Sequence, residues 1–275
     1  MTSLEAASNN EIVSKEARFP IVCMAYGNIE LAELYIDRLF AMLKRNCPIS
    51  FRLICYTDKP RELNPEVEQR DCSIWSEFDQ KEIPAYMRKL GLFNPEYMEL
   101  DEFIFLDLTL VIRKSLQELF DCAFLCPQDL VIAQDWYYNC YNSSVMRIRP
   151  HAMRFIYDAF LSREQPLSIF HGDQDFIHFV ISKQQKQNCV ALFHDGIIVS
   201  FKRMIKMGRR NPTLAQKIIE HATIIKFHGS PRMHQAFNPI YHFFNIRIQD
   251  LLRGKFSSPI SMSELNEHWR GSSAP

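Results

Sequence analysis

The first sixty residues contain an apolar run, a helical pattern and a second apolar run, and this order constrains the fold more than any other feature. Residues 20–25 are apolar and stop at Tyr26-Gly27-Asn28, which predicts a buried strand that ends in a turn. Residues 30–44 place apolar side chains three and four positions apart, which predicts an amphipathic helix. Residues 51–56 form the second apolar run. A strand, helix and strand with short connections favour a right-handed crossover, so we predict a parallel sheet.

The rest of the chain continues this alternation, and no repeat or linker divides it. Residues 103–112 are the most apolar segment and predict a central strand. The remaining patterns predict helices at 84–92, 151–161, 173–182 and 240–252, and strands at 130–133, 144–148, 196–201 and 223–227. We therefore predict one α/β domain over residues 19–255, with a mobile tail at 1–18 and a loose tail at 256–275. In such folds the ligand binds at the carboxyl ends of the strands.

Composition excludes several classes of protein. The 32 basic and 32 acidic residues balance, which argues against a nucleic-acid binder. No stretch approaches the 18 apolar residues that a transmembrane helix needs, and the first 18 residues are too polar for a secretory signal. The eight cysteines include no CxxC pair and favour reduced thiols, so we expect a cytoplasmic protein.

Asp107 lies inside the most apolar segment and is the main candidate for a functional residue. Burying a carboxylate costs several kcal/mol unless a cation or hydrogen bonds compensate it. Asp107 and Thr109 are two positions apart, so on a strand both side chains point to the same face. Two interpretations remain open at this point: the carboxylate caps a following turn, or it holds a ribose hydroxyl or a metal ion.

Five segments resemble motifs of the GT-A glycosyltransferases, in particular the family of glycogenin and the lipopolysaccharide galactosyltransferases. Residues 103–112 are similar to the strand and DxD turn of that family, and residues 86–98 to the lysine-bearing helix that precedes it. Residues 141–146 resemble its Asn-Ser-Gly-Val segment, and residues 171–175 its Gly-Asp-Gln motif. Residues 225–231 resemble its closing His-Phe-x-Gly segment with a nearby lysine.

The resemblance implies a GT-A domain, Rossmann-like, that transfers a hexose from a UDP-sugar to a hydroxyl acceptor with retention of configuration. The acceptor would be a glycan, a lipid-linked sugar or a protein. One alternative is a non-catalytic nucleotide-sugar-binding protein derived from such an enzyme. A weaker alternative is a nucleotidyltransferase, which would explain Asp107 but none of the later motifs.

The resemblance also implies roles for individual residues. A divalent cation, Mn²⁺ or Mg²⁺, would neutralise the diphosphate and would be held by Asp107 and His228, with Thr109 as a weak third ligand. The residues that face the reacting carbon would be Asp173 and Gln174. The residues that bind the donor would be Tyr26, which could stack on uracil, Lys89, Asp107, Asn142, Ser143, Lys226 and Gly229.

One departure from the family pattern puts the cation in question. Thr109 replaces the second Asp of DxD, and a hydroxyl brings no charge to a site that relies on carboxylates. The working prediction is a metal that binds weakly until the donor diphosphate completes its ligand shell. Two other outcomes remain open: the chain binds the sugar nucleotide without turnover, or basic side chains replace the metal, the candidates being Arg88, Lys89, Lys202, Arg203 and Lys226.

Two further segments have more than one interpretation. The basic run at residues 202–210 is typical of a solvated loop, but it could also neutralise phosphates or contact an anionic membrane that carries a lipid-linked acceptor. Trp136-Tyr137-Tyr138 is typical of a core segment, and aromatic rings of this kind also form platforms for acceptor sugars.

Overall fold

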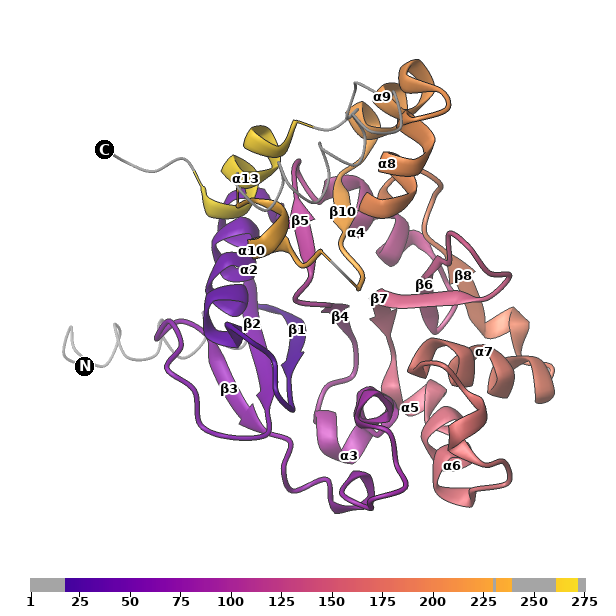
Figure 1. Cartoon of the computed structure of the whole chain (residues 1–275). Helices are drawn as coiled ribbons and strands as arrows, with labels where there is room; N and C mark the ends of the chain where they lie inside the picture. The colour runs from indigo at the N-terminus through magenta and orange to yellow at the C-terminus, as the bar shows by residue number, and fades with distance from the viewer. Residues whose placement is uncertain (1–17, 230, 239–260, 272–275) are drawn as a thin grey trace, which may run out of the picture.

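The structure of the protein is a computed structural model, which describes residues 18–229, 231–238 and 261–271. Its centre is a seven-stranded sheet with the order β3-β2-β1-β4-β7-β6-β8 (Figure 1). All neighbouring strands in this sheet are parallel except β7, which is antiparallel to both β4 and β6. The predicted α/β fold with a mostly parallel central sheet is confirmed. The strands are β1 Phe19–Ala25, β2 Phe51–Thr57, β3 Glu68–Asp71, β4 Phe103–Leu106, β6 Leu130–Gln134, β7 Tyr141–Ile148 and β8 Val190–Leu192.

A second, three-stranded sheet has the order β5-β10-β9, formed by Leu110–Ile112, Ile224–Lys226 and Ile198–Ser200. The prediction of one central strand over residues 103–112 is therefore wrong, because the segment is shared between the two sheets. β4 ends at Leu106 and β5 begins at Leu110. The polar pair in between, Asp107 and Thr109, hydrogen-bonds within itself and turns the chain from one sheet into the other.

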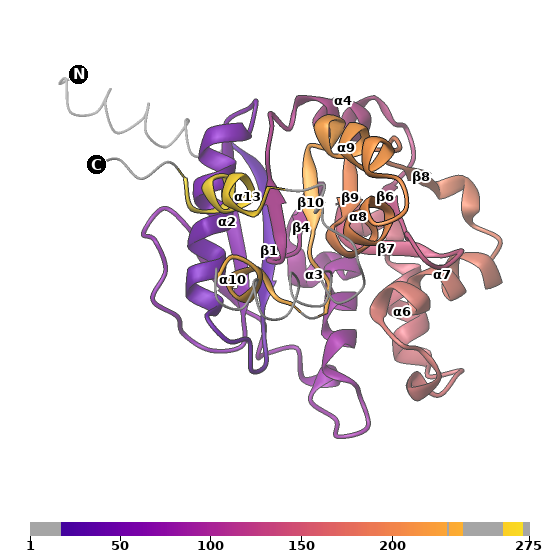
Figure 2. The ribbon, with the colours of Figure 1, turned by 45° about the horizontal axis from the view of Figure 1, so that its top comes forward.

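Alternating side chains of the large sheet belong to two separate apolar cores. On β1, Ile21 and Cys23 belong to one core and Val22 and Met24 to the other, as the two-residue period of a strand requires. One core is covered by α2 (Ala32–Asn46), α4 (Gln117–Leu125) and the small sheet; the other by the 3₁₀ helix η2 (Ala85–Phe93), α6 (Phe155–Ser162) and α7 (Asp173–Lys183). Figure 2 shows α2 and α7 on opposite sides of the strands.

Several expected helices differ in kind or extent. Residues 84–92 form the 3₁₀ helix η2, in which Gly91 packs so closely on Trp75 that a Cβ would lie 2.5 Å from the indole ring. The basic run at 202–210 falls mostly in a helix, α8 (Phe201–Gly208), and is not a loop. The remaining helices are η1 Ser76–Phe78, α3 Pro95–Met98, α5 Pro150–Met153, η3 Leu167–Ile169, η4 Gln187–Cys189, α9 Pro212–His221, α10 Met233–Ala236 and α13 Met262–Arg270.

The prediction of a loose tail over residues 256–275 is wrong for the part that forms α13. This helix buries Leu265 and Trp269, and the Trp269 ring lies 5.7 Å from the Tyr35 ring of α2. Figure 1 shows α13 beside α2. Residues 1–17 of the tail predicted at 1–18, and the predicted helix at 240–252, lie outside the described residues. No described helix combines the length and apolar character that crossing a membrane requires.

Candidate active site

The turn between β4 and β5 places Asp107 at the carboxyl end of β4. The Asp107 N–H donates to the Ser144 carbonyl at 2.9 Å, which keeps the start of the turn attached to β7. The Thr109 N–H and hydroxyl donate to Asp107 Oδ1 at 3.2 and 3.1 Å. Asp107 therefore does cap the turn that follows it. Its second oxygen, Oδ2, remains available for other partners.

Two lysines contact that second oxygen. Lys226 Nζ lies 2.9 Å and Lys89 Nζ 3.9 Å from Asp107 Oδ2. Burial by itself would raise the pKa of the Asp107 carboxyl, but the two lysines outweigh burial and hold its pKa well below the usual range. Lys226 also donates to the Thr109 hydroxyl. Asp107 thus stays ionised, as the compensation expected for a buried carboxylate requires.

Lys89 extends this group toward the start of α7. Its ammonium lies 3.4 Å from Asp173 Oδ2 and donates to the Ser143 hydroxyl at 3.2 Å. Burial would lower the pKa of Lys89, but Asp173 and Asp107 outweigh it and raise the pKa. For Lys226, burial lowers the pKa and Asp107 compensates only part of the shift. The site is therefore a row of alternating charges: Lys226, Asp107, Lys89 and Asp173.

A second polar group lies beside this row. Asp135 Oδ2 accepts hydrogen bonds from the Asn142 amide at 3.1 Å and the Gln174 amide at 3.3 Å. Asn142 also donates to Gln174 Oε1 at 3.3 Å. The sequence analysis missed Asp135, although the signal was present: it directly follows β6, as Asp107 directly follows β4. The structure thus connects the expected donor residue Asn142 to the expected catalytic residue Gln174.

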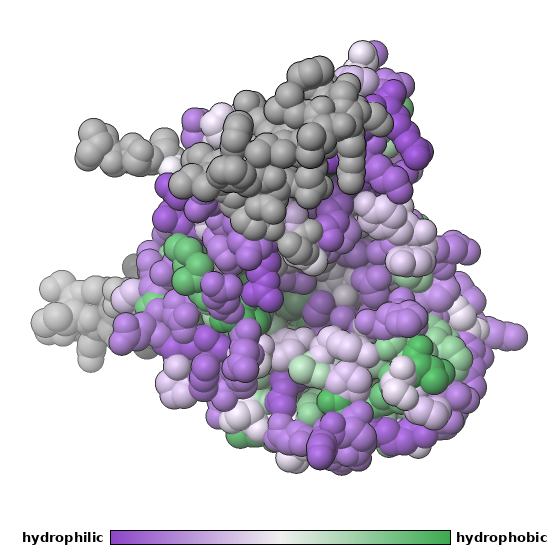
Figure 3. Space-filling model, in the orientation of Figure 1, coloured by the Kyte–Doolittle hydropathy of each residue, from purple (hydrophilic) through white to green (hydrophobic). Residues whose placement is uncertain are grey.

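Three cavities surround these groups, and Figure 3 shows the middle of this face of the molecule hollowed. The Asp107 cavity, of about 600 Å³, is lined among others by Asp107, Thr109, Lys226, His228, Gly229 and Arg232. The Gln174 cavity, of about 670 Å³, is lined among others by Tyr86, Cys140, Asp173 and Gln174. Volumes of this size suit small-molecule ligands.

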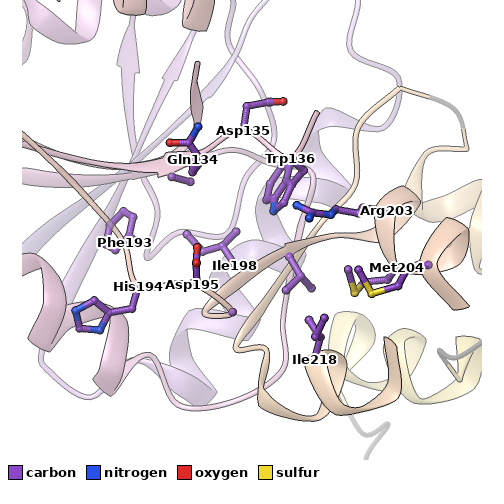
Figure 4. A pocket seen from close by; sticks show the side chains of 14 residues that line it. Gln134, Asp135, Trp136, Phe193, His194, Asp195, Ile198, Arg203, Met204 and Ile218 are labelled. Carbon is purple, nitrogen blue, oxygen red and sulfur yellow. The ribbon is translucent and has the colours of Figure 1, made fainter. Parts of the chain in front are cut away.

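The third cavity, of about 370 Å³, lies on the other side of Asp135 and is named here the Trp136 cavity. Figure 4 shows Arg203 of α8 extending toward the Trp136 indole, with Asp135 and Gln134 beyond the ring. Met204 and Ile218 form an apolar part of the wall. An aromatic face beside carboxylate and guanidinium groups is a surface that can bind a sugar by stacking and hydrogen bonds.

Tyr26 and Gly229 lie at the edges of the site. The Tyr26 hydroxyl donates to the Tyr86 carbonyl at 3.4 Å, and burial, with smaller contributions from Asp173 and Asp107, raises the pKa of Tyr26. Gly229 has φ +64°, and a Cβ there would lie 2.9 Å from Lys202 Nζ. The absence of a side chain at Gly229 therefore lets the Lys202 ammonium lie next to the Asp107 cavity.

The residues expected to hold a divalent cation do not form a cation site as they are placed. The Asp107 and Thr109 oxygens are already bonded to Lys226. His228 Nε2 shares a hydrogen bond of 2.6 Å with Ser200 Oγ, and its ring stacks on Trp136 at 6.1 Å. Burial, then Lys202 and Lys226, lower the pKa of His228. Across residues 18–229, 231–238 and 261–271, no three His, Cys, Asp or Glu side chains gather closely enough to hold a metal.

The spacing within the motif that this chain resembles, His-Phe-x-Gly, bears on the assignment of His228 as a ligand. Lys226-Phe227-His228-Gly229 matches its Phe and Gly, which puts Lys226, and not His228, at the position of the family histidine. In the structure, Lys226 ends β10 and its ammonium reaches Asp107 and Thr109. The sequence analysis assigned the histidine role to His228 by residue type and overlooked the spacing.

The other basic candidates divide between the site and its surroundings. Arg88 pairs with Asp79 and donates to the Cys72 carbonyl at 2.7 Å, so its guanidinium is used by the fold. Lys202 lies next to Gly229, and Arg203 lines the Trp136 cavity. Of the five basic candidates, Lys89 and Lys226 contact Asp107 in the part of the chain that the structure describes.

Solved structures with a similar fold are glycosyltransferases, and the chain has the GT-A fold that the resemblance implies. The galactosyltransferase LgtC, in complex with donor and acceptor sugar analogues, is similar with a TM-score of 0.57 and 15% identity, over 92% of this chain and 99% of LgtC. The bifunctional glycosyltransferase WbbM gives 0.59 and 11% identity, over 93% of this chain and 50% of WbbM.

Mouse xyloside xylosyltransferase 1 is similar with a TM-score of 0.52 and 16% identity, over 78% of this chain and 98% of that enzyme. The sequence matches no protein-family model, and no curated protein sequence is significantly similar to it. At these identities the comparisons show the fold alone.

Proposed function

We propose that the protein is a glycosyltransferase that transfers a hexose from a UDP-sugar to a hydroxyl acceptor. The observation that carries this proposal is the contact of Asp107 with two lysines at the carboxyl end of β4. In an open α/β sheet that is the place where a ligand binds. Cations beside a cavity are what a diphosphate leaving group requires, because its charge must be neutralised before it departs.

The proposed donor lies across the Asp107 and Gln174 cavities. Lys89 and Lys226 would bind the diphosphate, and Asp107 would accept a ribose hydroxyl. Tyr26 would stack on uracil, while Gly229 would leave room for the phosphates beside Lys202. The hexose would then reach Asn142, Ser143, Asp173 and Gln174. Lys89 holds Ser143 and Asp173, and the Asp135 carboxylate holds Asn142 and Gln174 by accepting their amide hydrogen bonds.

The proposed reaction retains the configuration of the sugar. The acceptor oxygen forms a bond to the anomeric carbon on the face that the diphosphate leaves, and the bond from that carbon to the phosphate oxygen breaks. The departing phosphate takes the proton of the acceptor hydroxyl, so the products are the glycoside and UDP. Gln174 and Asp173 would stabilise positive charge near the anomeric carbon, since an amide oxygen and a carboxylate carry negative charge.

The acceptor is proposed to bind in the Trp136 cavity, because Asp135 connects that cavity to Asn142 and Gln174. A glycan, a lipid-linked sugar or a sugar-bearing protein would stack on Trp136 and hydrogen-bond to Asp135 or Arg203. The basic face of α8 is compatible with peripheral contact to an anionic membrane. Location in the cytoplasm stays a prediction from the cysteine pattern.

The divalent cation that the resemblance implies is left out of the proposed reaction. A cation would need Asp107 and a second anionic or imidazole ligand, and the described residues offer Asp107 to Lys226 instead. Mn²⁺ or Mg²⁺ brought by the donor diphosphate stays a prediction of the family resemblance.

The test is UDP release from a panel of UDP-sugars, measured with and without simple sugar acceptors. We expect one donor to be consumed, and Asp107→Ala to lower turnover by about a thousandfold or more, since the site loses its central carboxylate. The matched control is Asp101→Ala, because the Asp101 carboxylate is fully exposed and its change leaves the site intact. Turnover by Asp107→Ala equal to that of Asp101→Ala would refute the site. UDP binding without any UDP release would favour the non-catalytic alternative.

A further inference from the structure

We propose that the ammonium group of Lys226 takes the place of the divalent cation, so that the donor diphosphate binds to this chain without a metal ion. This inference deepens the proposed function and rests on it, because it concerns how the same UDP-sugar is held. Its basis is a placement: one cationic nitrogen contacts both residues of the degenerate DxD pair, Asp107 and Thr109.

The Lys226 ammonium contacts both residues of the pair and still faces the Asp107 cavity. Its Nζ lies 2.9 Å from Asp107 Oδ2 and donates to Thr109 Oγ1, which in turn donates to Asp107 Oδ1. An ammonium group has three N–H donors. Two of them are directed at Asp107 and Thr109, and the third is available toward the Asp107 cavity that Lys226 lines. A phosphate oxygen in that cavity would complete the set.

The Thr109 hydroxyl suits an ammonium partner better than a metal ion. A hydroxyl is a poor partner for Mn²⁺ or Mg²⁺ but a good acceptor for an ammonium N–H, and here it also donates to the carboxylate. An aspartate at position 109 would put two carboxylates around one ammonium. With Thr109, one carboxylate matches one ammonium. The change at position 109 and the lysine at position 226 therefore compensate each other.

The buried charges beside the cavity balance without a metal ion. Asp107 and Asp173 are matched by Lys89 and Lys226, all within 4 Å contacts. A divalent ion added to this group would face two ammonium groups. Among the described residues that line the cavity, Glu30 is the one carboxylate besides Asp107. A diphosphate, in contrast, would meet Lys202 and Arg232 at the cavity's edge in addition to the two buried lysines.

The first experiment titrates UDP into the full chain by calorimetry, in EDTA and in Mn²⁺. We expect dissociation constants that agree within about twofold, because the cation is supplied by a side chain. Binding that needs Mn²⁺ would overturn this inference and leave the proposed glycosyltransferase standing. No UDP binding in either condition would overturn the proposed function and the inference with it.

The second experiment replaces the charge of Lys226. Lys226→Met keeps most of the length of the side chain without the charge, and we expect UDP binding in EDTA to weaken about ten- to a hundredfold, the usual range for a hydrogen bond to a charged group. Lys226→Arg should recover most of the affinity. The matched control is Lys44→Met, since Lys44 is half exposed on α2 and pairs with Glu66. Circular dichroism and a thermal melt establish that each variant is folded. Equal UDP affinity in Lys226→Met and Lys44→Met would overturn the inference.

The third experiment exchanges the lysine for a metal site. The double variant Thr109→Asp, Lys226→His supplies a second carboxylate and an imidazole around Asp107. We expect it to bind Mn²⁺, detected as loss of the free-ion signal in electron paramagnetic resonance, and to bind UDP only when Mn²⁺ is present. The unchanged chain should leave the free-ion signal intact at the same concentration. Stoichiometric Mn²⁺ binding by the unchanged chain, or UDP binding by the double variant that ignores Mn²⁺, would contradict the assignment.

Discussion

Two buried basic side chains lie within the same pair of sheets but serve different ends. Arg147, next to the last residue of β7, is fully buried and donates to the carbonyl oxygens of Ala123 at 2.9 Å and Cys126 at 2.7 Å. Lys226, from the end of β10, is almost as deeply buried. Its partners are side chains and it lines a cavity, whereas Arg147 has one more distant side-chain partner, Glu102, at 3.5 Å.

The difference shows how to separate a structural charge from a functional one. The Arg147 guanidinium satisfies backbone carbonyls in the last turn and at the C-cap of α4, so its charge stabilises the fold. The Lys226 ammonium satisfies a carboxylate that is itself out of place in an apolar segment. Backbone carbonyls account for the burial of the Arg147 charge but not for that of Lys226, and a buried carboxylate accounts for Lys226. Burial alone therefore does not mark a site; burial with side-chain partners beside a cavity does.

The largest effect is expected from Arg147→Met, which would sharpen the contrast. Removing the guanidinium leaves the Ala123 and Cys126 carbonyls without their donor, so the free energy of unfolding should fall by about 3 kcal/mol. Urea denaturation measures the loss, and calorimetry should show unchanged UDP affinity in the folded protein. A stable Arg147→Met variant with impaired UDP binding would contradict the purely structural role of Arg147.

A smaller effect is expected from Gln174→Ala in the Asp135 network. Turnover should fall about ten- to a hundredfold because a group that faces the reacting carbon is lost, while the melting temperature should change little. Steady-state kinetics with the donor found in the panel measure it. Gln216→Ala is the matched control, since Gln216 is exposed on α9 and its amide bonds to Glu220, away from the Asp135 network. Equal turnover in the two variants would remove Gln174 from the site.

The smallest effect is a pH dependence of stability. The folded pKa of Asp107 lies below its unfolded value, so the carboxylate stabilises the fold above about pH 4, and that contribution is lost as the pH falls further. The melting temperature of the unchanged chain should therefore exceed that of Asp107→Asn at neutral pH, and the gap should narrow below pH 4. A gap that stays constant down to pH 2 would show that the lysines do not act on this carboxyl through their charge.

Much of the fold followed from the sequence because its signals are local. The period of apolar residues in α2 and the short runs of β1 and β2 depend on neighbours in the chain, and these elements were predicted within a few residues. The polar interruption of the most apolar segment, also a local signal, located Asp107. A helix was also predicted at 84–92, but not its 3₁₀ type or the close contact of Gly91 with Trp75, which is a tertiary one.

The site residues that escaped prediction depended on spacing and distance in space. His228 looked like a ligand by type, yet Lys226, two positions earlier, has the ammonium that reaches Asp107. Asp135 had the same strand-end signal as Asp107 but lay in a less apolar context, so it drew no attention. Helix α13 shows only two buried side chains, Leu265 and Trp269, which is too few for a strong periodic signal.

The docking of α13 on α2 has a consequence for how the chain is made. Arg38 of α2 donates to the Arg270 carbonyl, across 232 positions of sequence. A ribosome that adds 5–20 residues per second needs roughly 10 to 50 seconds to cover that interval. During that time the face of α2 that carries Tyr35 lacks its contact with Trp269. The nascent chain therefore carries an uncovered aromatic surface beside its first strands, and a chaperone that shields it would act before translation of α13.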